Sequence, residues 1–208
     1  AIRKVHWLFN YPDPASDRDV DLAIRRAARM VPSRPRQALG ITANMRDQLL
    51  GVCGDDLIGL RNKVLISVGF DTLCRRGELV SISIGDLTKT QGGRYQVLVR
   101  RAKNDPVGLG RICRLSSRSS RLIDSWTKAI GADRGALLRP VYGQRALSCH
   151  LNASTISRIL KKLATKSLEN GVAGKVSGHS LRVGAAQQLT MDGRDILQVM
   201  RAGGRRST

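Results

Sequence analysis

The sequence predicts an α+β protein: a mainly helical domain with a small three-stranded antiparallel sheet, preceded by an amphipathic helix and a linker. Residues 57–73, LIGLRNKVLISVGFDTL, are the most apolar stretch. VLISVGF alone would also fit a strand, but the whole run is long for one and favours a core helix. Short β-rich segments follow, and helical patterns then resume. At 208 residues and 41% hydrophobic content, the chain can form one globular domain, or one domain and part of another.

Helical patterns precede the core helix. Residues 18–30, RDVDLAIRRAARM, place apolar residues on one face and arginines on the other, which predicts an amphipathic helix. Residues 31–40, VPSRPRQALG, contain two prolines and end on glycine, so they are interpreted as a linker. A second helix is expected over 41–51, with Thr42 as a candidate N-cap.

The pattern changes after the core helix. Three short segments are rich in β-formers and predict the antiparallel sheet: SISIGDL (81–87), RYQVLVRR (94–101) and GRICRL (110–115). The sequences TKTQGG and AKNDPVGL lie between them and are typical of turns. Helices are then expected at 120–130, 154–164 and 178–193, with a short one at 194–201.

The charge of the chain points to an anionic partner. The formal net charge is +20, with 27 arginines against 9 lysines, and arginine favours bidentate contacts with phosphate. Nucleic acid is the leading candidate, and an anionic membrane surface is the second. Aromatic content of 3% argues against single-strand binding by base stacking. No apolar run approaches the roughly 20 residues of a membrane span, and the first residues lack a signal-peptide core.

The cysteines and histidines indicate no bound metal. The four cysteines have no CxxC spacing, and Cys74 and Cys113 fall in segments expected to be buried. They fit free thiols in a reducing compartment better than disulfides or a zinc site. The three histidines are scattered. We therefore expect neither a metal nor a cofactor.

Two polar positions near the sheet have both an ordinary and a functional interpretation. Arg75 and Glu78, in CRRGELVSI, are expected to share a face at the end of the apolar helix. They are either a surface ion pair of little energetic weight or an arginine in a cleft held by its carboxylate. Lys103, in the turn RRAKNDPVG, is either an ordinary exposed lysine or an ammonium group that projects into a groove.

The stretch GHSLRVGAA (178–186) is the third such position. His179 and Arg182 are three residues apart at the head of a predicted helix, where backbone N–H groups also point outward and could meet an anion. The alternative is an ordinary helix start, with Ser177 or Ser180 as the N-cap. The small residues 184–186 would allow close packing on the other side of this helix.

Together these positions resemble the tyrosine recombinase (phage integrase) family, most closely its Cre-like members. The order is an arginine, a glutamate three residues later, a lysine in a hairpin turn, and GHSxR opening a late helix. TLCRRGEL (72–79) is similar to the first arginine box of that family, and GHSLRVGAA to its second. VMRAGG (199–204) is similar to the segment just after the second box.

The resemblance runs from about Thr42 to the end of the chain and implies a domain organisation. Residues 1–30 would be the C-terminal remnant of the helical core-binding domain, which contacts DNA in this family. Residues 31–40 would be the interdomain linker, and residues 41–208 the catalytic domain without its C-terminal tyrosine segment.

The resemblance also implies roles for individual residues. In this family a tyrosine attacks the scissile phosphodiester and forms a 3′-phosphotyrosine. Arg75 and Arg182 match the arginines that clamp the non-bridging oxygens, a task suited to the guanidinium fork. Lys103 matches the general acid, His179 a proton-transfer or phosphate-binding group, and Glu78 the acidic residue that orients the cluster. The resemblance further implies double-stranded DNA, a tetramer on paired sites, and a cytoplasmic protein of bacterial, phage or plasmid origin.

The sequence departs from the family pattern in two ways. Arg205 occupies the place of a usual His or Trp, where it could still donate a hydrogen bond to phosphate. The nucleophile is expected beyond Thr208, because Tyr11, Tyr95 and Tyr142 all precede the second box. The sequence therefore predicts a site-specific recombinase seen without its nucleophile. The alternatives are a non-catalytic DNA-binding module, a type IB topoisomerase-like enzyme or, more distantly, a basic RNA-binding protein.

Overall fold

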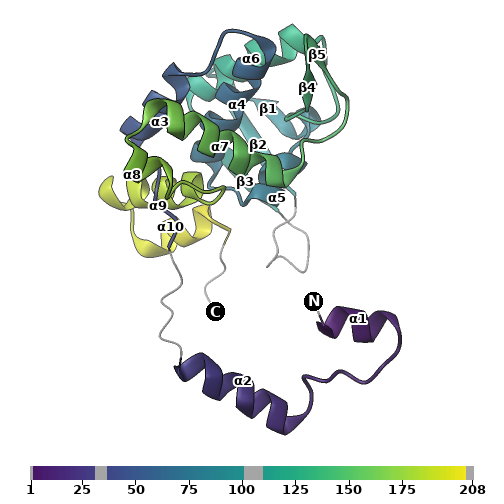
Figure 1. Cartoon of the computed structure of the whole chain (residues 1–208). Coiled ribbons are helices and arrows are strands. Elements are labelled where there is room, and N and C mark those ends of the chain that lie inside the picture. Colours follow the sequence, from purple (N-terminus) through teal and green to yellow (C-terminus); the bar gives the residue numbers. More distant parts are fainter. Residues whose placement is uncertain (1, 31–36, 101–109, 205–208) are drawn as a thin grey trace. The chain divides into compact units, whose positions relative to one another are not determined.

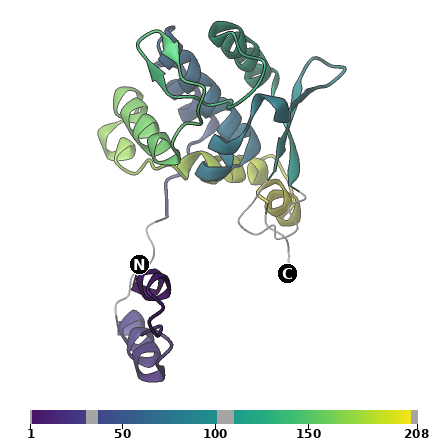
Figure 2. The ribbon, with the colours of Figure 1, turned by 90° about the vertical axis from the view of Figure 1, so that its right-hand side faces the viewer.

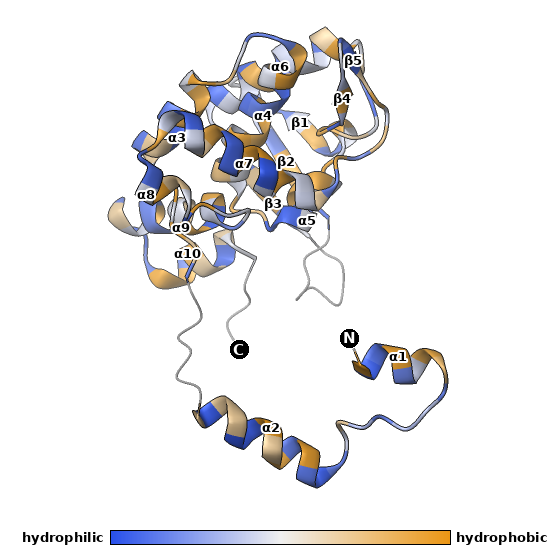
Figure 3. Cartoon of the chain, viewed as in Figure 1, coloured by the Kyte–Doolittle hydropathy of each residue, from blue (hydrophilic) through white to orange (hydrophobic). Residues whose placement is uncertain are grey.

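The structure is a computed structural model that describes residues 2–30, 37–100 and 110–204. The chain forms two compact units, Ala1–Gln37 and Ala38–Thr208 (Figure 1). The first contains α1 (Ile2–Leu8) and α2 (Arg18–Met30). The bounds of α2 are those predicted, and orange and blue residues mix along it in Figure 3 as expected of an amphipathic helix. The sequence pattern did not indicate α1. The assignment of this unit to a core-binding domain stays a prediction.

The second unit is built around α4 (Leu57–Thr72), which confirms that the apolar stretch is a helix. Asp56 caps its N-terminus by accepting a hydrogen bond from the Gly59 N–H at 2.7 Å. Eleven of the sixteen residues of α4 are buried, because it packs against α6 (Ser117–Ile130) and α9 (Ser180–Met191). The preceding helix, α3 (Ala43–Gly51), has Thr42 as its N-cap, as predicted.

The three-stranded sheet has the predicted antiparallel order. It consists of β1 (Leu87–Lys89), β2 (Tyr95–Val99) and β3 (Arg111–Arg114), with β2 in the centre. Buried Val97 lies opposite Leu87 on one side and Cys113 on the other. Turned by 90°, the chain shows this sheet at one side of the helical body (Figure 2).

The prediction of a strand over 81–87 is wrong. Ser81 ends α5 (Arg76–Ser81), residues 84–86 form the 3₁₀ turn η1 (Ile84–Asp86), and only Leu87 belongs to β1. Between them, Ser83 forms an isolated β-bridge with Ala136. The buried carboxylate of Asp86 accepts the Ser83 N–H at 2.9 Å and the Arg100 Nε–H at 2.5 Å. Because Asp86 caps a helical turn here, the strand starts later and includes part of the predicted turn TKTQGG.

The remaining helices confirm the predicted ones, with shifted ends. They are α6, α7 (Ala153–Ser167), α9 and α10 (Ile196–Ala202). α6 begins earlier than expected because Ser116 caps it. The small hairpin of β4 (Val141–Tyr142) and β5 (Arg145–Ala146) and the short α8 (Asn170–Ala173) were not predicted.

The core of the second unit is continuous from α3 to α9. Its largest fully buried side chain is Trp126 of α6, whose indole N–H donates to the Leu137 carbonyl at 2.7 Å. α9 also packs closely against the backbone at Ile41: a Cβ at Gly184 would lie 1.8 Å from the Ile41 carbonyl oxygen. The predicted close packing of the small residues in this helix is thereby confirmed.

The four cysteines are free thiols, and Cys149 is the exposed one. Cys74 and Cys113 are buried, as predicted. Within the described ranges, no group of three His, Cys, Asp or Glu side chains could hold a metal ion. None of the described helices is both long and apolar enough to cross a membrane.

Candidate functional site

The candidate site surrounds the turn that connects α4 to α5. α4 ends at Thr72, and Leu73 adopts a left-handed conformation with φ of 51°, which is uncommon for a side chain of this size. The chain then enters α5, with Arg75 at the N-cap and Glu78 in the first turn. The pair therefore directly follows the apolar helix, as expected, but it begins a separate helix that was not predicted. The left-handed residue stops α4 and redirects the chain.

Glu78 is a buried carboxylate, with 5% of its surface exposed. Its Oε2 accepts the backbone N–H of Arg75 at 3.1 Å, and its Oε1 accepts from Nη1 of the same residue at 2.6 Å. Arg111 of β3 donates from Nη2 to Oε2 at 3.1 Å. Burial raises the pKa of Glu78, but the hydrogen bonds from Arg75 and the charge of Arg111 outweigh it and leave the pKa below its ordinary value. The pair is thus not an exposed surface ion pair.

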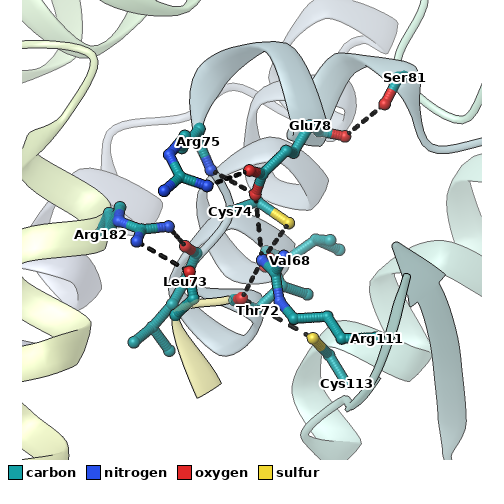
Figure 4. A network of polar contacts seen from close by, with 11 residues as sticks. Val68, Thr72, Leu73, Cys74, Arg75, Glu78, Ser81, Arg111, Cys113 and Arg182 are labelled. Atoms are coloured by element: carbon teal, nitrogen blue, oxygen red, sulfur yellow. Dashed lines mark hydrogen bonds and ion pairs between the residues drawn. The ribbon is translucent and has the colours of Figure 1, made fainter. Parts of the chain in front are cut away.

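Arg182 of α9 is held at the same turn. Its Nη1 donates to the Leu73 carbonyl at 2.7 Å, and its Nη2 donates to the Gly203 carbonyl at 2.8 Å. Figure 4 shows Arg75, Glu78, Arg111 and Arg182 gathered around the end of α4. The motifs TLCRRGEL and GHSLRVGAA and the segment VMRAGG therefore contact one another, although TLCRRGEL is far from the other two in the sequence.

His179 occupies the N-cap position of α9 and is exposed. Its backbone N–H donates to the Ser177 Oγ at 3.2 Å, and the Ser180 Oγ accepts from the Ser177 N–H at 2.9 Å. The alternative of Ser177 or Ser180 as the N-cap is wrong, since both hydroxyls instead close the turn before the helix. His179 lies one helical turn before Arg182, as the spacing predicted.

Two predicted site residues, Lys103 and Arg205, lie outside the described residues. The strands on either side of Lys103, β2 and β3, pair as an antiparallel hairpin with Val99 opposite Arg111. Gly204, which precedes Arg205, is close to the cluster, because a Cβ there would lie 2.8 Å from the Arg111 Nη1.

Sequence reasoning missed two arginines near the cluster. Arg111 was assigned only to a strand, yet it shares a strand face with buried Cys113, and this alternation could have indicated that it points inward. Arg76 donates to the Ser157 Oγ of α7 at 3.2 Å, and its side chain lies where a Cβ at Gly178 would be. The glycine of GHSLRVGAA therefore gives room to an arginine from the first motif.

The cluster carries an excess of positive charge. Two guanidinium groups pair with the Glu78 carboxylate, and that of Arg182 lies at the Leu73 carbonyl, which leaves two positive charges in excess next to the carbonyl end of α4. Fixed guanidinium groups of this kind bind an anionic oxygen without reorganisation.

Tyr142, one of the three tyrosines of the chain, lies away from this cluster. It is 72% exposed in β4, and Figure 1 draws its hairpin away from α9 and α10.

The fold and cluster define the class of protein. Residues 40–208 match the phage integrase family, and the chain belongs to that family. It is 27% identical to the recombinase Cre of Escherichia phage P1, over 98% of this chain and 64% of Cre. It is 31% identical to an integrase/recombinase XerD homolog of Selenomonas ruminantium, over 71% of this chain and 44% of that protein. The chain thus spans two thirds or less of the length of these relatives.

Solved structures share the fold. The XerA recombinase matches with a TM-score of 0.63 and 24% identity, over 85% of this chain and 58% of that one. The XerH site-specific recombinase bound to palindromic difH substrate matches with a TM-score of 0.64 and 19% identity, over 84% of this chain and 48% of that one. The predicted α+β class, mainly helical with a small antiparallel sheet, is confirmed.

Proposed function

We propose that this chain is the catalytic part of a site-specific DNA recombinase that cleaves and rejoins strands through a 3′-phosphotyrosine. One observation carries the proposal: Arg75 and Arg182, from two separate motifs, are fixed around the same turn at the end of α4. Glu78 holds the first through two hydrogen bonds. A pair of immobilised guanidinium groups suits a phosphorane transition state, whose negative charge grows on the non-bridging oxygens.

Each residue has a role in this proposal. Arg75 and Arg182 clamp the non-bridging oxygens, and Glu78 orients the first of them. Lys103, from the β2–β3 connection, protonates the leaving 5′-oxygen. His179 binds the phosphate or transfers a proton. Arg205 donates a hydrogen bond to the phosphate where most relatives of this kind have His or Trp.

The proposed partner is double-stranded DNA, bound by a homotetramer on paired sites. The net charge of +20 supports an anionic polymer, and the XerH recombinase, which shares the fold, is bound to its difH substrate in the matching structure. Binding of the chain to duplex should weaken steeply with salt, because neutralising many phosphates releases counterions. The slope of log affinity against log salt, measured by fluorescence anisotropy, tests this, and a flat response would refute the DNA proposal.

The proposed location is the bacterial cytoplasm. The free thiols and the phage and bacterial origin of the relatives support it.

The catalytic proposal is tested in a gene product that carries a tyrosine after residue 208. Arg182→Ala should abolish covalent adducts on a nicked suicide duplex but leave most of the duplex affinity. Arg134→Ala, which removes a charge from a side chain that is 95% exposed, is the matched control and should form adducts normally. Normal adduct yield from Arg182→Ala would refute its assigned role. A reading frame that stops at Thr208, with no adduct from any chain, would favour the non-catalytic DNA-binding module.

A further inference from the structure

We propose that Arg111, on β3, is a positioning residue of this site: it holds Glu78 through Oε2, while Oε1 holds the Arg75 guanidinium, and so it fixes that guanidinium. The inference rests on the proposed function, since it names a further residue of the same site. Arg111 is outside the motifs on which the resemblance of this chain to its family rests.

The contacts of Arg111 connect the sheet to the turn that carries the cluster. Its Nη2 lies 3.1 Å from the Glu78 Oε2, 3.3 Å from the Thr72 carbonyl oxygen and 3.4 Å from the Cys74 Sγ. These three acceptors come from the end of α4, the connecting turn and the first turn of α5. One guanidinium nitrogen therefore ties together the whole segment around Arg75 (Figure 4).

The burial of Arg111 argues for a role beyond stability. Its side chain is 13% exposed, and its Nε and Nη1 are buried with no hydrogen-bond partner in the described structure. Unsatisfied buried donors are costly, and apolar residues of similar volume often replace buried ion pairs without loss of stability. An arginine is therefore a poor choice for packing alone at this position. It is a good choice for holding a carboxylate in one orientation.

Arg111 also adjoins the support of the second arginine. A Cβ at Gly204 would lie 2.8 Å from the Arg111 Nη1, so the guanidinium lies against the backbone of the turn after α10. The neighbouring Gly203 carbonyl accepts the hydrogen bond from Arg182. Arg111 thus contacts the carboxylate that holds Arg75 and packs beside the turn that holds Arg182.

The two oxygens of Glu78 have different partners. Oε1 accepts from the Arg75 side chain, whereas Oε2 accepts from the Arg75 backbone and from Arg111. Without Arg111, Oε2 would keep only the backbone donor, so the carboxylate would be less constrained in rotation and Arg75 would move with it. Among the described residues, the ionisable groups that face Glu78 are the guanidinium groups of Arg75 and Arg111 and the thiols of Cys74 and Cys113. Burial raises the pKa of Glu78, and the side-chain and backbone hydrogen bonds from Arg75 together with the charge and hydrogen bond of Arg111 keep it below the ordinary value.

A titration of Glu78 in the 208-residue chain tests the contact without any reaction. The chain is labelled with ¹³C in the glutamate carboxyls, and Glu78→Gln assigns the signal. Arg111→Met should raise the pKa of Glu78, and Arg111→Lys, which keeps the charge but not the fork, should raise it less. Arg114→Met is the matched control, because Arg114 is an exposed arginine on the same strand. An unchanged pKa of Glu78 in folded Arg111→Met would overturn the inference.

The reaction tests the consequence for Arg75, in a gene product with a tyrosine after residue 208. Arg111→Met should slow adduct formation about tenfold or more, the effect of losing one hydrogen bond to a charged group, while duplex affinity stays equal to that of Arg114→Met. The acid limb of its pH–rate profile should move to higher pH, because a Glu78 with a raised pKa is protonated sooner. Adduct rates equal to wild type would overturn the inference.

The two proposals fail in different ways. If the wild-type chain forms no adduct, the recombinase proposal fails, and the titration still decides whether Arg111 fixes Glu78. If the wild type forms adducts and Arg111→Met does so equally well, the Arg111 inference fails alone. If Arg111→Met does not fold, Arg111→Lys decides: intermediate values support the inference, and wild-type values in both experiments refute it.

Discussion

Replacing the buried carboxylate of Glu78 should destabilise the second unit. Glu78→Gln keeps the shape of the side chain and one acceptor oxygen, but removes the negative charge that pairs with Arg75 and Arg111. Both partners are largely buried, with side-chain exposures of 27% and 13%. Removing one member of a buried pair costs about 3–5 kcal/mol, and the retained amide oxygen offsets part of that. We expect a loss of about 2–4 kcal/mol in the free energy of unfolding at pH 7.

The effect should depend on pH with a definite sign. The pKa of Glu78 lies below its ordinary value of 4.5 in the folded chain, so the carboxylate contributes stability that is fully present above that value. This contribution is lost as the pH falls through the folded-state pKa. The difference in stability between wild type and Glu78→Gln should therefore be constant from pH 8 to about pH 5 and shrink below pH 4.5.

Urea unfolding followed by tryptophan fluorescence measures this difference. Trp126 is fully buried in the second unit, whereas Trp7 is 77% exposed in the first, so a Trp7→Phe background isolates the signal of the second unit. Asp55→Asn is the control, because the Asp55 side chain is fully exposed and forms an ion pair with Lys63 at the surface; the urea midpoint of this variant should not change. Equal stability of Glu78→Gln and wild type at pH 7 would refute the buried-carboxylate reasoning.

Two further predictions concern packing and thiol reactivity. Gly184→Ala should lower the free energy of unfolding by about 1–3 kcal/mol, because its Cβ would collide with the Ile41 carbonyl. Gly77→Ala should instead raise the free energy of unfolding by up to about 1 kcal/mol, because a Cβ at this position of α5 meets open space. Urea midpoints equal to that of the wild type would contradict both predictions. An aromatic disulfide reagent should quickly label the thiol of exposed Cys149 in the native chain. Cys74 should react slowly, because it is buried and burial raises its pKa to about 12. Fast labelling of Cys74 would show that the turn between α4 and α5 opens to solvent.

The sequence predicted elements whose signals are local and failed where a tertiary contact decides. The apolar run of α4 and the amphipathic pattern of α2 are visible in the residues themselves. The start of β1 was predicted too early because SISI has high β-propensity, whereas Asp86 caps a helical turn there by accepting from Ser83 and Arg100. The separate helix α5 was missed because nothing in its sequence shows that Leu73 turns left-handed.

The site was predictable where motifs carry it. The spacing of Arg75 to Glu78 and of His179 to Arg182 placed them in the right local geometry. The meeting of Arg182 with the Leu73 carbonyl depends on how α9 packs on α4, which no local pattern encodes. Arg111 shows the same limit, because its partner Glu78 is 33 residues away in the sequence.

The end of α4 positions two arginines of the cluster through neighbouring backbone carbonyl groups. Arg111 hydrogen-bonds to the Thr72 carbonyl across 39 residues of sequence, and Arg182 to the neighbouring Leu73 carbonyl across 109. Displacements that accumulate along those intervening segments do not change how the two arginines are placed, because both hydrogen-bond to adjacent carbonyl groups, that of the last residue of α4 and that of the left-handed residue after it. Insertions elsewhere in either segment should therefore leave the spacing of the cluster unchanged, so loops of this chain can diverge without a loss of registration at the site.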